Sequence, residues 1–525
     1  MFKHIRQFFA PAPHIALRPP DEVRRLYPRY RWRVMESTFI GYAMFYLVRN
    51  NLSVVAKDMK GDLGYDNAAI GDILAVAALS YGLGKFVMGA LSDRSNPRKF
   101  MAFGLLLTAI CNFAFGAAAS GAAWITGLAE QGWIPRWLGG AHSLTGTYWI
   151  HLGLWALNGF FQGMGWPPCG RSMGHWFSEK ERGLTFSIWN TSHNVGGGIA
   201  GMIAAYAAIH WGGWQWAFYF PGILALIGSV YLFLRLVDTP QSVGLPPIEG
   251  YHRDRRFCER CGYDLHGLPQ PRCPECGLVF EPRTEAPPER ELTYRELFID
   301  SVLANKLVWL LALGNFFSYI ARYSMLDWGP TYLREVKNAS LAGGGLAVLV
   351  LEFGGIPSTI ALGWLSDRLG GRRGMVCVLC LLPIIVAFAT IMLTPPGYLQ
   401  IDMAMLAAIG FFIYPVVNLI VIMALDATGK KAIGTAAGFI GLFGYIGRMA
   451  QAKGFGWMLV HFQELYGKET AWNIVLAAIL ICTGLAVLFL SFTWKLTPRS
   501  ALSVGRRDTR QQADATEPVS PTPRS

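Results

Sequence analysis

Long apolar segments recur along most of the chain and alternate with short polar connections. A helix needs about 20 mostly apolar residues to cross a bilayer, and segments of this kind form one group before residue 237 and another after residue 303. The predicted spans are residues 34–56, 68–91, 100–120, 148–168, 183–208, 214–236, 304–329, 342–365, 374–394, 401–424, 433–458 and 471–494. The pattern predicts an all-α membrane protein with 12 transmembrane helices in two pseudo-symmetric six-helix bundles.

The polar segments divide the chain into five expected parts. These are a cytoplasmic N-terminal segment (1–33), a first bundle (34–236), a central cytoplasmic linker (237–303), a second bundle (304–494) and a disordered cytoplasmic tail (495–525). Residues 1–33 are basic and lack the apolar core of a cleavable signal peptide, so the first span is expected to direct its own insertion. Tryptophans in residues 121–147 indicate a short interfacial helix there.

Composition and charge support a membrane location. Only 15% of the residues are charged, whereas soluble domains carry about 25%. The net charge of +12 comes from lysines and arginines in short loops, including residues 93–99, 180–182, 368–373 and 430–431. These loops share one face if both termini are cytoplasmic, which is the positive-inside pattern of a multi-pass inner-membrane protein. The same distribution argues against nucleic acid as the partner of the positive charge.

An internal repeat relates the two halves. Gly89–Arg94 matches Gly363–Arg368, with an offset of 363 − 89 = 274 residues, and each copy closes the second helix of its half. The charged members of these loops, Asp93, Arg94, Asp367 and Arg368, are candidates for a conformational loop motif. Two like halves commonly enclose a transport site at their interface near the middle of the membrane.

The repeat also pairs two intramembrane arginines. Arg49 lies inside the first span and Arg322 inside the seventh, 322 − 49 = 273 residues apart, so the repeat places them at equivalent depths. A buried arginine costs at least about 2.5–3.5 kcal/mol at a helix centre, and two facing arginines repel each other. An anion would neutralise both, and guanidinium groups bind phosphate through two hydrogen bonds. Alternatively, each arginine pairs with a carboxylate such as Asp327, or caps a carbonyl.

Three further polar residues are predicted near this depth. His193 lies in the fifth span and could titrate with the second ionisation of a phosphate, or it could be a hydrogen-bonded packing residue. Lys85 and Glu352 lie in the second and eighth spans. We expect an ion pair between them across the halves, which either breaks during transport or is static.

Three motifs resemble a known family. Residues 162–171, 188–198 and 322–333 are similar to the organophosphate:phosphate antiporters of the major facilitator superfamily, of the glycerol-3-phosphate and hexose-phosphate transporter type. The resemblance runs from about residue 30 to 495, apart from the central insert. It implies a transporter and not an enzyme, which exchanges an organic phosphate ester for inorganic phosphate by alternating access and needs no cofactor for transport.

The resemblance also implies roles for individual residues. It assigns phosphate binding to Arg49 and Arg322, and contacts around the substrate to His193, Lys85, Trp166, Trp189 and Tyr319. Glu352 and Asp327 are implied as members of gating ion pairs, with Lys85 as the partner of Glu352. Asn50 stands where the family has a lysine, which removes the expected partner of Asp327. Ala437 and Ile440 replace the acid–lysine pair of hexose-phosphate transporters, which favours a smaller ester such as glycerol 3-phosphate.

The central linker carries two closely spaced cysteine pairs. Cys258 and Cys261 form the first pair, and Cys273 and Cys276 form the second. Four thiolates at this spacing are typical of a structural zinc site, and a cytoplasmic location favours metal over disulfides. We therefore predict a small zinc-ribbon-like knuckle at residues 257–280, which either stiffens the linker or docks a cytoplasmic partner.

Two other functions remain open at this point. The chain could be a membrane sensor that binds a phosphate ester without moving it, with the zinc module as its signalling contact. It could also be a facilitator for another oxyanion such as nitrate. An enzyme is not indicated, because a closed four-thiolate site leaves no open coordination position for a reacting ligand.

Overall fold

The structure is a computed structural model that describes residues 7–118, 146–248, 272–279, 299, 302–428 and 433–497. The expected interfacial helix at 121–147 and the expected disordered tail lie almost entirely outside these residues, as does the first cysteine pair of the predicted zinc module.

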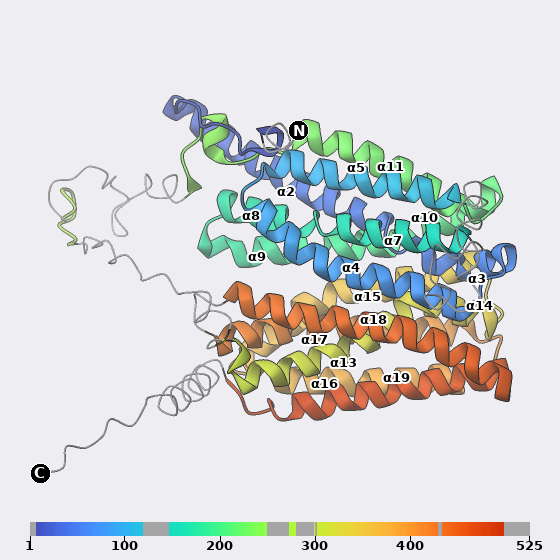
Figure 1. Cartoon of the computed structure of the whole chain (residues 1–525). Coiled ribbons are helices and arrows are strands. Elements are labelled where there is room, and N and C mark those ends of the chain that lie inside the picture. The colour runs from blue at the N-terminus through green and yellow to red at the C-terminus, as the bar shows by residue number, and fades with distance from the viewer. Residues whose placement is uncertain are drawn as a thin grey trace, which may run out of the picture.

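The helices form two groups that lie side by side (Figure 1). The N-terminal half contains α2 (Pro20–Leu47), α3 (Asn51–Leu63), α4 (Asn67–Ser92), α5 (Pro97–Gly116), α7 (Gly146–Gln162), α8 (Trp166–Trp176), α9 (Glu179–Asn190), α10 (Ser192–Trp211) and α11 (Trp216–Arg235). The C-terminal half contains α13 (Lys306–Asp327), α14 (Gly329–Glu335), α15 (Leu341–Arg368), α16 (Arg373–Leu393), α17 (Leu399–Ala427), α18 (Ile433–Tyr466) and α19 (Lys468–Ser491). A short 3-10 turn, η4 (Pro240–Val243), follows the first half.

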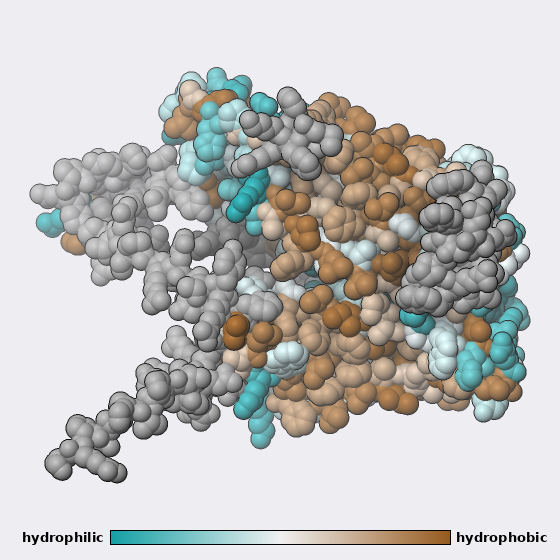
Figure 2. All heavy atoms as spheres, viewed as in Figure 1, coloured by the Kyte–Doolittle hydropathy of each residue, from teal (hydrophilic) through white to brown (hydrophobic). Residues whose placement is uncertain are grey.

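The surface has the pattern of a membrane protein. Figure 2 shows a hydrophobic band around the middle of the visible face and hydrophilic residues toward both ends. In the part of the chain that the structure describes, seven helices are long and apolar enough to cross a bilayer: α4, α5, α11, α15, α16, α17 and α19. An apolar surface of this extent would be unfavourable in water, so the protein is a multi-pass membrane protein.

Helices are present at each predicted span, but several boundaries differ from the prediction. The helix of the first span, α2, begins at Pro20, well before residue 34, and the chain leaves the helix at Val48–Asn50, between α2 and α3. The fourth predicted span is interrupted at Gly163–Gly165, between α7 and α8, and the proline at the start of α8 has no N–H to continue the preceding helix. Hydropathy alone misses such breaks because the residues around them remain apolar.

Two helix crossings join the halves, α4 with α18 and α10 with α15. Glycines permit the close approach at both. A Cβ atom on Gly71 of α4 would lie 2.6 Å from the carbonyl oxygen of Ala452 in α18. A Cβ atom on Gly201 of α10 would lie 2.9 Å from the carbonyl oxygen of Gly345 in α15. Small residues at these contacts let the two backbones pack directly against each other.

Ion pairs between the halves gather at one end of the molecule. We define the basic end by the loops Asp93–Asn96 and Leu369–Arg372. At the opposite end, α3 lies beside α14 (Figure 1). There Asp58 pairs with Arg334, Lys60 pairs with Glu335, and Asp72 pairs with Lys453. Within the described ranges, every ion pair that joins the two halves belongs to this set, so this conformation is held closed away from the basic end.

Asp238 organises the basic end of the N-terminal half. Its carboxylate accepts a hydrogen bond of 2.8 Å from the backbone N–H of Ala12 and lies 3.4 Å from the Arg171 guanidinium. Its backbone carbonyl accepts a hydrogen bond of 2.8 Å from Trp176. Arg171 also donates to the carbonyls of Ser92 and Ser95, beside the predicted loop motif. The N-terminal segment, the linker and the α4–α5 loop therefore form one packed layer.

The candidate loop residues themselves are partly defined. Asp93 follows the C-terminus of α4, and its backbone N–H donates a hydrogen bond of 3.2 Å to the carbonyl of Gly89. In the second copy, the Arg368 guanidinium lies 3.9 Å from the centre of the Trp364 ring. The side chain of Asp367 lies outside the described part of the structure.

Candidate anion-binding site

Arg49 lies at the break between α2 and α3, facing aromatic rings. Its guanidinium carbon is 3.9 Å from the centre of the Tyr81 ring and 4.7 Å from that of Tyr46. Its Nη1 atom is buried and has no hydrogen-bond partner among the described residues. The rings stabilise the cation through their π faces, but they cannot accept hydrogen bonds as an oxyanion would.

Arg322 has an equivalent environment in the other half. It lies on α13 with 6% of its surface exposed. Its guanidinium carbon lies 4.4 Å from the Tyr414 ring centre, 5.0 Å from that of Tyr323 and 6.0 Å from that of Tyr319. Its Nε atom is also buried without a partner in the described structure. Each half thus presents one guanidinium that is surrounded by tyrosines and retains an unused donor.

The two arginines share neighbours across the boundary between the halves. The His193 ring centre lies 5.7 Å from that of Tyr46 and 5.6 Å from that of Tyr414, so it lies between one ring from each half. Glu352 accepts a hydrogen bond from the hydroxyl of Tyr414, whose ring also faces Arg322. Tyr46 faces Arg49 and Tyr414 faces Arg322, so His193 connects the surroundings of the two arginines, which the sequence repeat predicted to face a common region.

Unsatisfied polar atoms mark the same region. Arg49 Nη1, Arg322 Nε and the Trp189 Nε1 donor are buried without partners in the described residues. A buried donor without a partner costs about 1–3 kcal/mol, and more when it is charged. The Glu352 Oε1 acceptor is also buried without a partner in the described residues, so three unused donors and two positive charges are set against one carboxylate. The excess of positive charge favours an anion with several oxygens at this position.

Comparison with known proteins identifies the family of this chain. The family profile of the Major Facilitator Superfamily matches residues 38–452. This chain belongs to the Major Facilitator Superfamily. It is also 37% identical to the glycerol-3-phosphate transporter of Bacillus subtilis over 494 residues, which cover 94% of this chain and 98% of that protein. The organophosphate:phosphate antiporter type is thereby shown, as the sequence motifs predicted.

Other relatives of this chain are named as a hexose phosphate transport protein and as a membrane sensor protein. A probable hexose phosphate transport protein of Chlamydia pneumoniae is 35% identical, over 95% of this chain and 98% of that protein. The membrane sensor protein UhpC of Escherichia coli is 30% identical, over 94% and 99%. A solved structure of a bacterial homolog of the human lysosomal transporter Spinster, inward-facing and unoccupied, has a TM-score of 0.59 at 16% identity, covering 94% of this chain and 99% of that chain. That likeness shows the fold alone.

The other side chains predicted to contact substrate each pack against aromatic rings. Trp189 is fully buried and stacks on Tyr42, with ring centres 5.0 Å apart. Tyr319 lies between the rings of Tyr323 and Tyr445, at 5.4 and 5.6 Å. Trp166 is contacted by the Lys85 ammonium, 5.0 Å from its ring centre. Of these side chains Tyr319 faces a site arginine directly, with its ring centre 6.0 Å from the Arg322 guanidinium carbon.

The predicted Lys85–Glu352 ion pair is not formed in this structure. Glu352 is fully buried, where it accepts hydrogen bonds from Asn194 at 3.0 Å and from the Tyr414 hydroxyl. Lys85 instead faces Trp166 at the start of α8. The reason is geometric, because Glu352 packs against α10 and Lys85 points away from that crossing, toward α8. The expectation of a pair between repeat-related helices did not take side-chain direction into account.

Asp327 has a partner that sequence reasoning missed. The Arg448 guanidinium of α18 donates to it at 2.6 and 3.1 Å, and the Gln451 amide donates at 2.7 Å. Asp327 therefore pairs neither with Arg49 nor with Arg322, which excludes that alternative for this conformation. Although Asn50 removes a lysine expected from the family pattern, the carboxylate is neutralised by a cation in its own half.

Several tyrosines of the site were also missed: Tyr42, Tyr46, Tyr81, Tyr323, Tyr414 and Tyr445. One signal could have found two of the aromatic neighbours together. Tyr46 and Tyr319 each precede a site arginine by three residues, and 319 − 46 = 273 is the offset between the arginines. Arg448 was equally visible as a charge within the eleventh predicted span.

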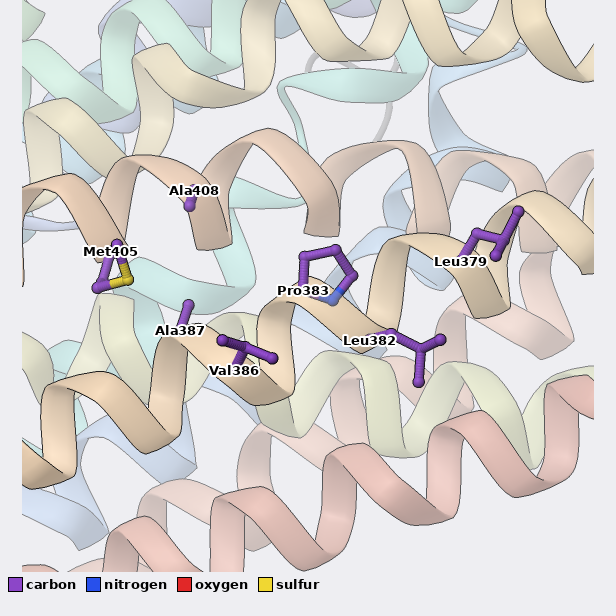
Figure 3. Close-up of a pocket in the computed structure, with 7 residues that line it drawn as sticks. All are labelled: Leu379, Leu382, Pro383, Val386, Ala387, Met405 and Ala408. Carbon is purple, nitrogen blue, oxygen red and sulfur yellow. The ribbon is translucent and has the colours of Figure 1, made fainter.

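A separate hollow lies on the outer side of the C-terminal half, between α16 and α17. Its volume is about 600 Å³, and it is lined by Leu379, Leu382, Pro383, Val386, Ala387, Met405 and Ala408 (Figure 3). These side chains offer no hydrogen bonds or charges to a phosphate. The hollow is therefore not the anion site.

Proposed function

We propose that this protein is a secondary active transporter that exchanges a small organic phosphate ester for inorganic phosphate by alternating access. Arg49 and Arg322, one from each half, would bind the phosphate group. The observation that carries this proposal is that both guanidinium groups are surrounded by rings, retain buried unused donors and have no carboxylate partner in the described structure. Relatives named as glycerol-3-phosphate and hexose phosphate transporters support the substrate class.

Residues around the arginines would complete the substrate site. His193 reaches both halves through its ring neighbours and could contact the ester or its phosphate. Lys85, Trp166, Trp189 and Tyr319 are proposed as further contacts. The absence of an acid–lysine pair at Ala437 and Ile440 favours a substrate of the size of glycerol 3-phosphate over a hexose phosphate.

The proposed topology has 12 spans, both termini in the cytoplasm and a location in the cell membrane. The basic loops support this orientation through the positive-inside rule. Because the ion pairs between the halves lie opposite the basic end, the described conformation would be closed to the outside. In this topology the two bundles are residues 34–236 and 304–494. The linker between them and both terminal segments would lie on the cytoplasmic side.

A structural zinc ion in the linker is a second part of the proposal. The described pair, Cys273 and Cys276, lies in a tight turn where Cys273 donates its N–H to the carbonyl of Leu278 at 2.9 Å. Gly277 has a φ of 70°, a left-handed conformation that glycine adopts without strain. Such a turn suits a zinc knuckle, and Cys258 and Cys261, outside the described residues, would supply the remaining thiolates. The module would stiffen the linker or dock a cytoplasmic partner.

The function can be tested in proteoliposomes loaded with phosphate. External glycerol 3-phosphate should release labelled phosphate from wild-type vesicles, and Arg49→Lys or Arg322→Lys should abolish this release, because lysine cannot form the paired hydrogen bonds of a guanidinium. Arg235→Lys is a matched control, since Arg235 lies in a partly exposed pair with Glu36, away from the site. Retained exchange in both site variants would rule out the assignment.

A phosphate-ester sensor is the second candidate, because the relative named UhpC is a membrane sensor protein. Deleting residues 257–280 separates the two functions. A transporter should still exchange phosphate, whereas a sensor would bind the ester without exchange and lose its cellular output. A nitrate facilitator would instead show counterflow with nitrate that phosphate does not inhibit.

A further inference from the structure

A third buried guanidinium lies close to the two that are proposed to bind the phosphate group. Arg448 is 7% exposed and its guanidinium carbon lies 4.1 Å from the centre of the Tyr323 ring. Arg322 lies 5.0 Å from the centre of that same ring. Arg49, in the opposite half, faces Tyr81, and the Tyr445 ring centre lies 4.7 Å from that of Tyr81 and 6.5 Å from that of Tyr323. Three positive side chains therefore meet around one group of tyrosines.

Arg448 differs from the other two in having a carboxylate partner. Asp327, 3% exposed, accepts two hydrogen bonds from Arg448 and one from Gln451. All three donors come from α18, and Asp327 lies at the end of α13, so the whole cluster belongs to the C-terminal half. Movement of the two halves relative to each other would leave these hydrogen bonds intact.

The position of Asp327 makes its neutralisation important for anion binding. It accepts a hydrogen bond from Arg448, whose guanidinium shares the Tyr323 ring with that of Arg322, so an unpaired carboxylate here would have Arg322 as a neighbouring cation. A buried carboxylate attracts the nearest available cation strongly, because little water screens its charge. Without Arg448, Asp327 would compete with phosphate for Arg322 or Arg49.

We infer that Arg448 is a positioning residue of the transport site. By holding Asp327 within its own half, it keeps Arg49 and Arg322 available to the anion. The inference rests on the proposed function, because it takes these two arginines to be the phosphate ligands. Arg448 itself engages Asp327 through two of its nitrogen atoms, so its role is exerted through the carboxylate.

Phosphate binding and exchange by the full-length protein test this role. Calorimetry in detergent should give a Kd for inorganic phosphate that is about tenfold weaker in Arg448→Gln, since the freed carboxylate competes with the anion. The double variant Arg448→Gln/Asp327→Asn should return to within about threefold of wild type, because the competing charge is then removed. Arg448→Lys retains the charge and should weaken binding less than Arg448→Gln does.

The alternative is that the pair only supports helix packing. In that case Arg448→Gln would lower the melting temperature and the yield with the Kd unchanged, and Asp327→Asn would add to the loss instead of reversing it. Either result would overturn the inference. Arg373→Gln is the control, since Arg373 pairs with Asp426 in the same half but at the basic end.

The outcomes also separate this inference from the proposed function. Wild-type exchange together with an unchanged Kd in Arg448→Gln would overturn the inference and leave the transporter assignment standing. A wild-type protein that neither binds nor exchanges phosphate would overturn both. If Arg448→Gln does not fold, Arg448→Lys takes its place, because an ammonium cannot form the two parallel hydrogen bonds of the guanidinium. A Kd equal to that of wild type, or a weaker Kd that Arg448→Lys/Asp327→Asn does not restore, counts against the inference.

Discussion

Arg334 of α14 donates parallel hydrogen bonds of 2.6 and 2.8 Å to the two carboxylate oxygens of Asp58 in α3, which joins the halves at the end away from the basic loops. The fork geometry makes this contact more specific than a single ion pair. Lys57 adds a hydrogen bond of 2.9 Å to the carbonyl of Arg334. In the proposed transport cycle this contact would have to open before the site could reach the other side of the membrane.

Asp58→Asn should weaken this gate. We expect the equilibrium to shift by about tenfold toward the conformation that opens this end, since one of the three ion pairs between the described parts of the halves is lost. Spin labels at Asp62 and Gln463, both exposed at this end, should report a longer distance. Glu36→Gln breaks an ion pair within one half and should leave the distance unchanged. An unaltered distribution in Asp58→Asn would show that the pair does not control the gate.

Gly201→Ala should disturb the crossing of α10 and α15. The added Cβ would meet the carbonyl of Gly345 at 2.9 Å, so the two helices must separate before this end can close. We expect the exchange rate to fall by about tenfold. Gly454→Ala on α18 is the control, because its Cβ would meet no atom within 4 Å. Equal rates in the two variants would mean that the crossing has room to adjust.

Glu352→Gln should strengthen phosphate binding and slow turnover. The carboxylate is fully buried and accepts a hydrogen bond from Tyr414, whose ring faces Arg322, so the change removes a negative charge beside the site. Phosphate would then be held more tightly, by about tenfold in Kd, and be released more slowly. Calorimetry and exchange kinetics on the same preparation give both quantities. Weaker binding in the variant would contradict this view of the charge balance.

Cys273→Ser should remove the bound metal without stopping exchange. We expect about one zinc per wild-type chain by elemental analysis and close to none in the variant, because three thiolates bind structural zinc much less tightly than four. Cys482→Ser, which changes a cysteine of α19 in the C-terminal half, is the control for the effect of a cysteine substitution outside the linker. A wild-type protein free of zinc after purification without chelators would remove this part of the proposal.

The sequence was informative where one physical rule decided the outcome. Apolar length located the membrane helices, because a bilayer admits few other structures. The arginines could be paired from the repeat alone, since Arg49 and Arg322 share an offset that no side-chain detail alters. Both arguments depend on spacing along the chain.

Contacts that depend on side-chain direction could not be predicted in this way. Lys85 and Glu352 lie in repeat-related helices, yet one faces α8 and the other faces α10. Arg448 and Asp327 are 121 residues apart and meet only because α18 packs against α13. No sequence period encodes that meeting. The polar start of α2 was missed for a different reason, because hydropathy does not register a helix that continues beyond the membrane.

The tyrosine rings around Arg49 and Arg322 affect how the unloaded protein behaves. An aromatic face stabilises a cation by about 0.5–2 kcal/mol, which is much less than a desolvated oxyanion provides. The empty carrier would therefore have to bring two poorly compensated charges together in order to reverse its orientation. A vesicle that contains this protein should keep its internal phosphate until a substrate arrives from outside. The aromatic lining alone would then make exchange obligatory, with no separate group needed to couple the two substrates.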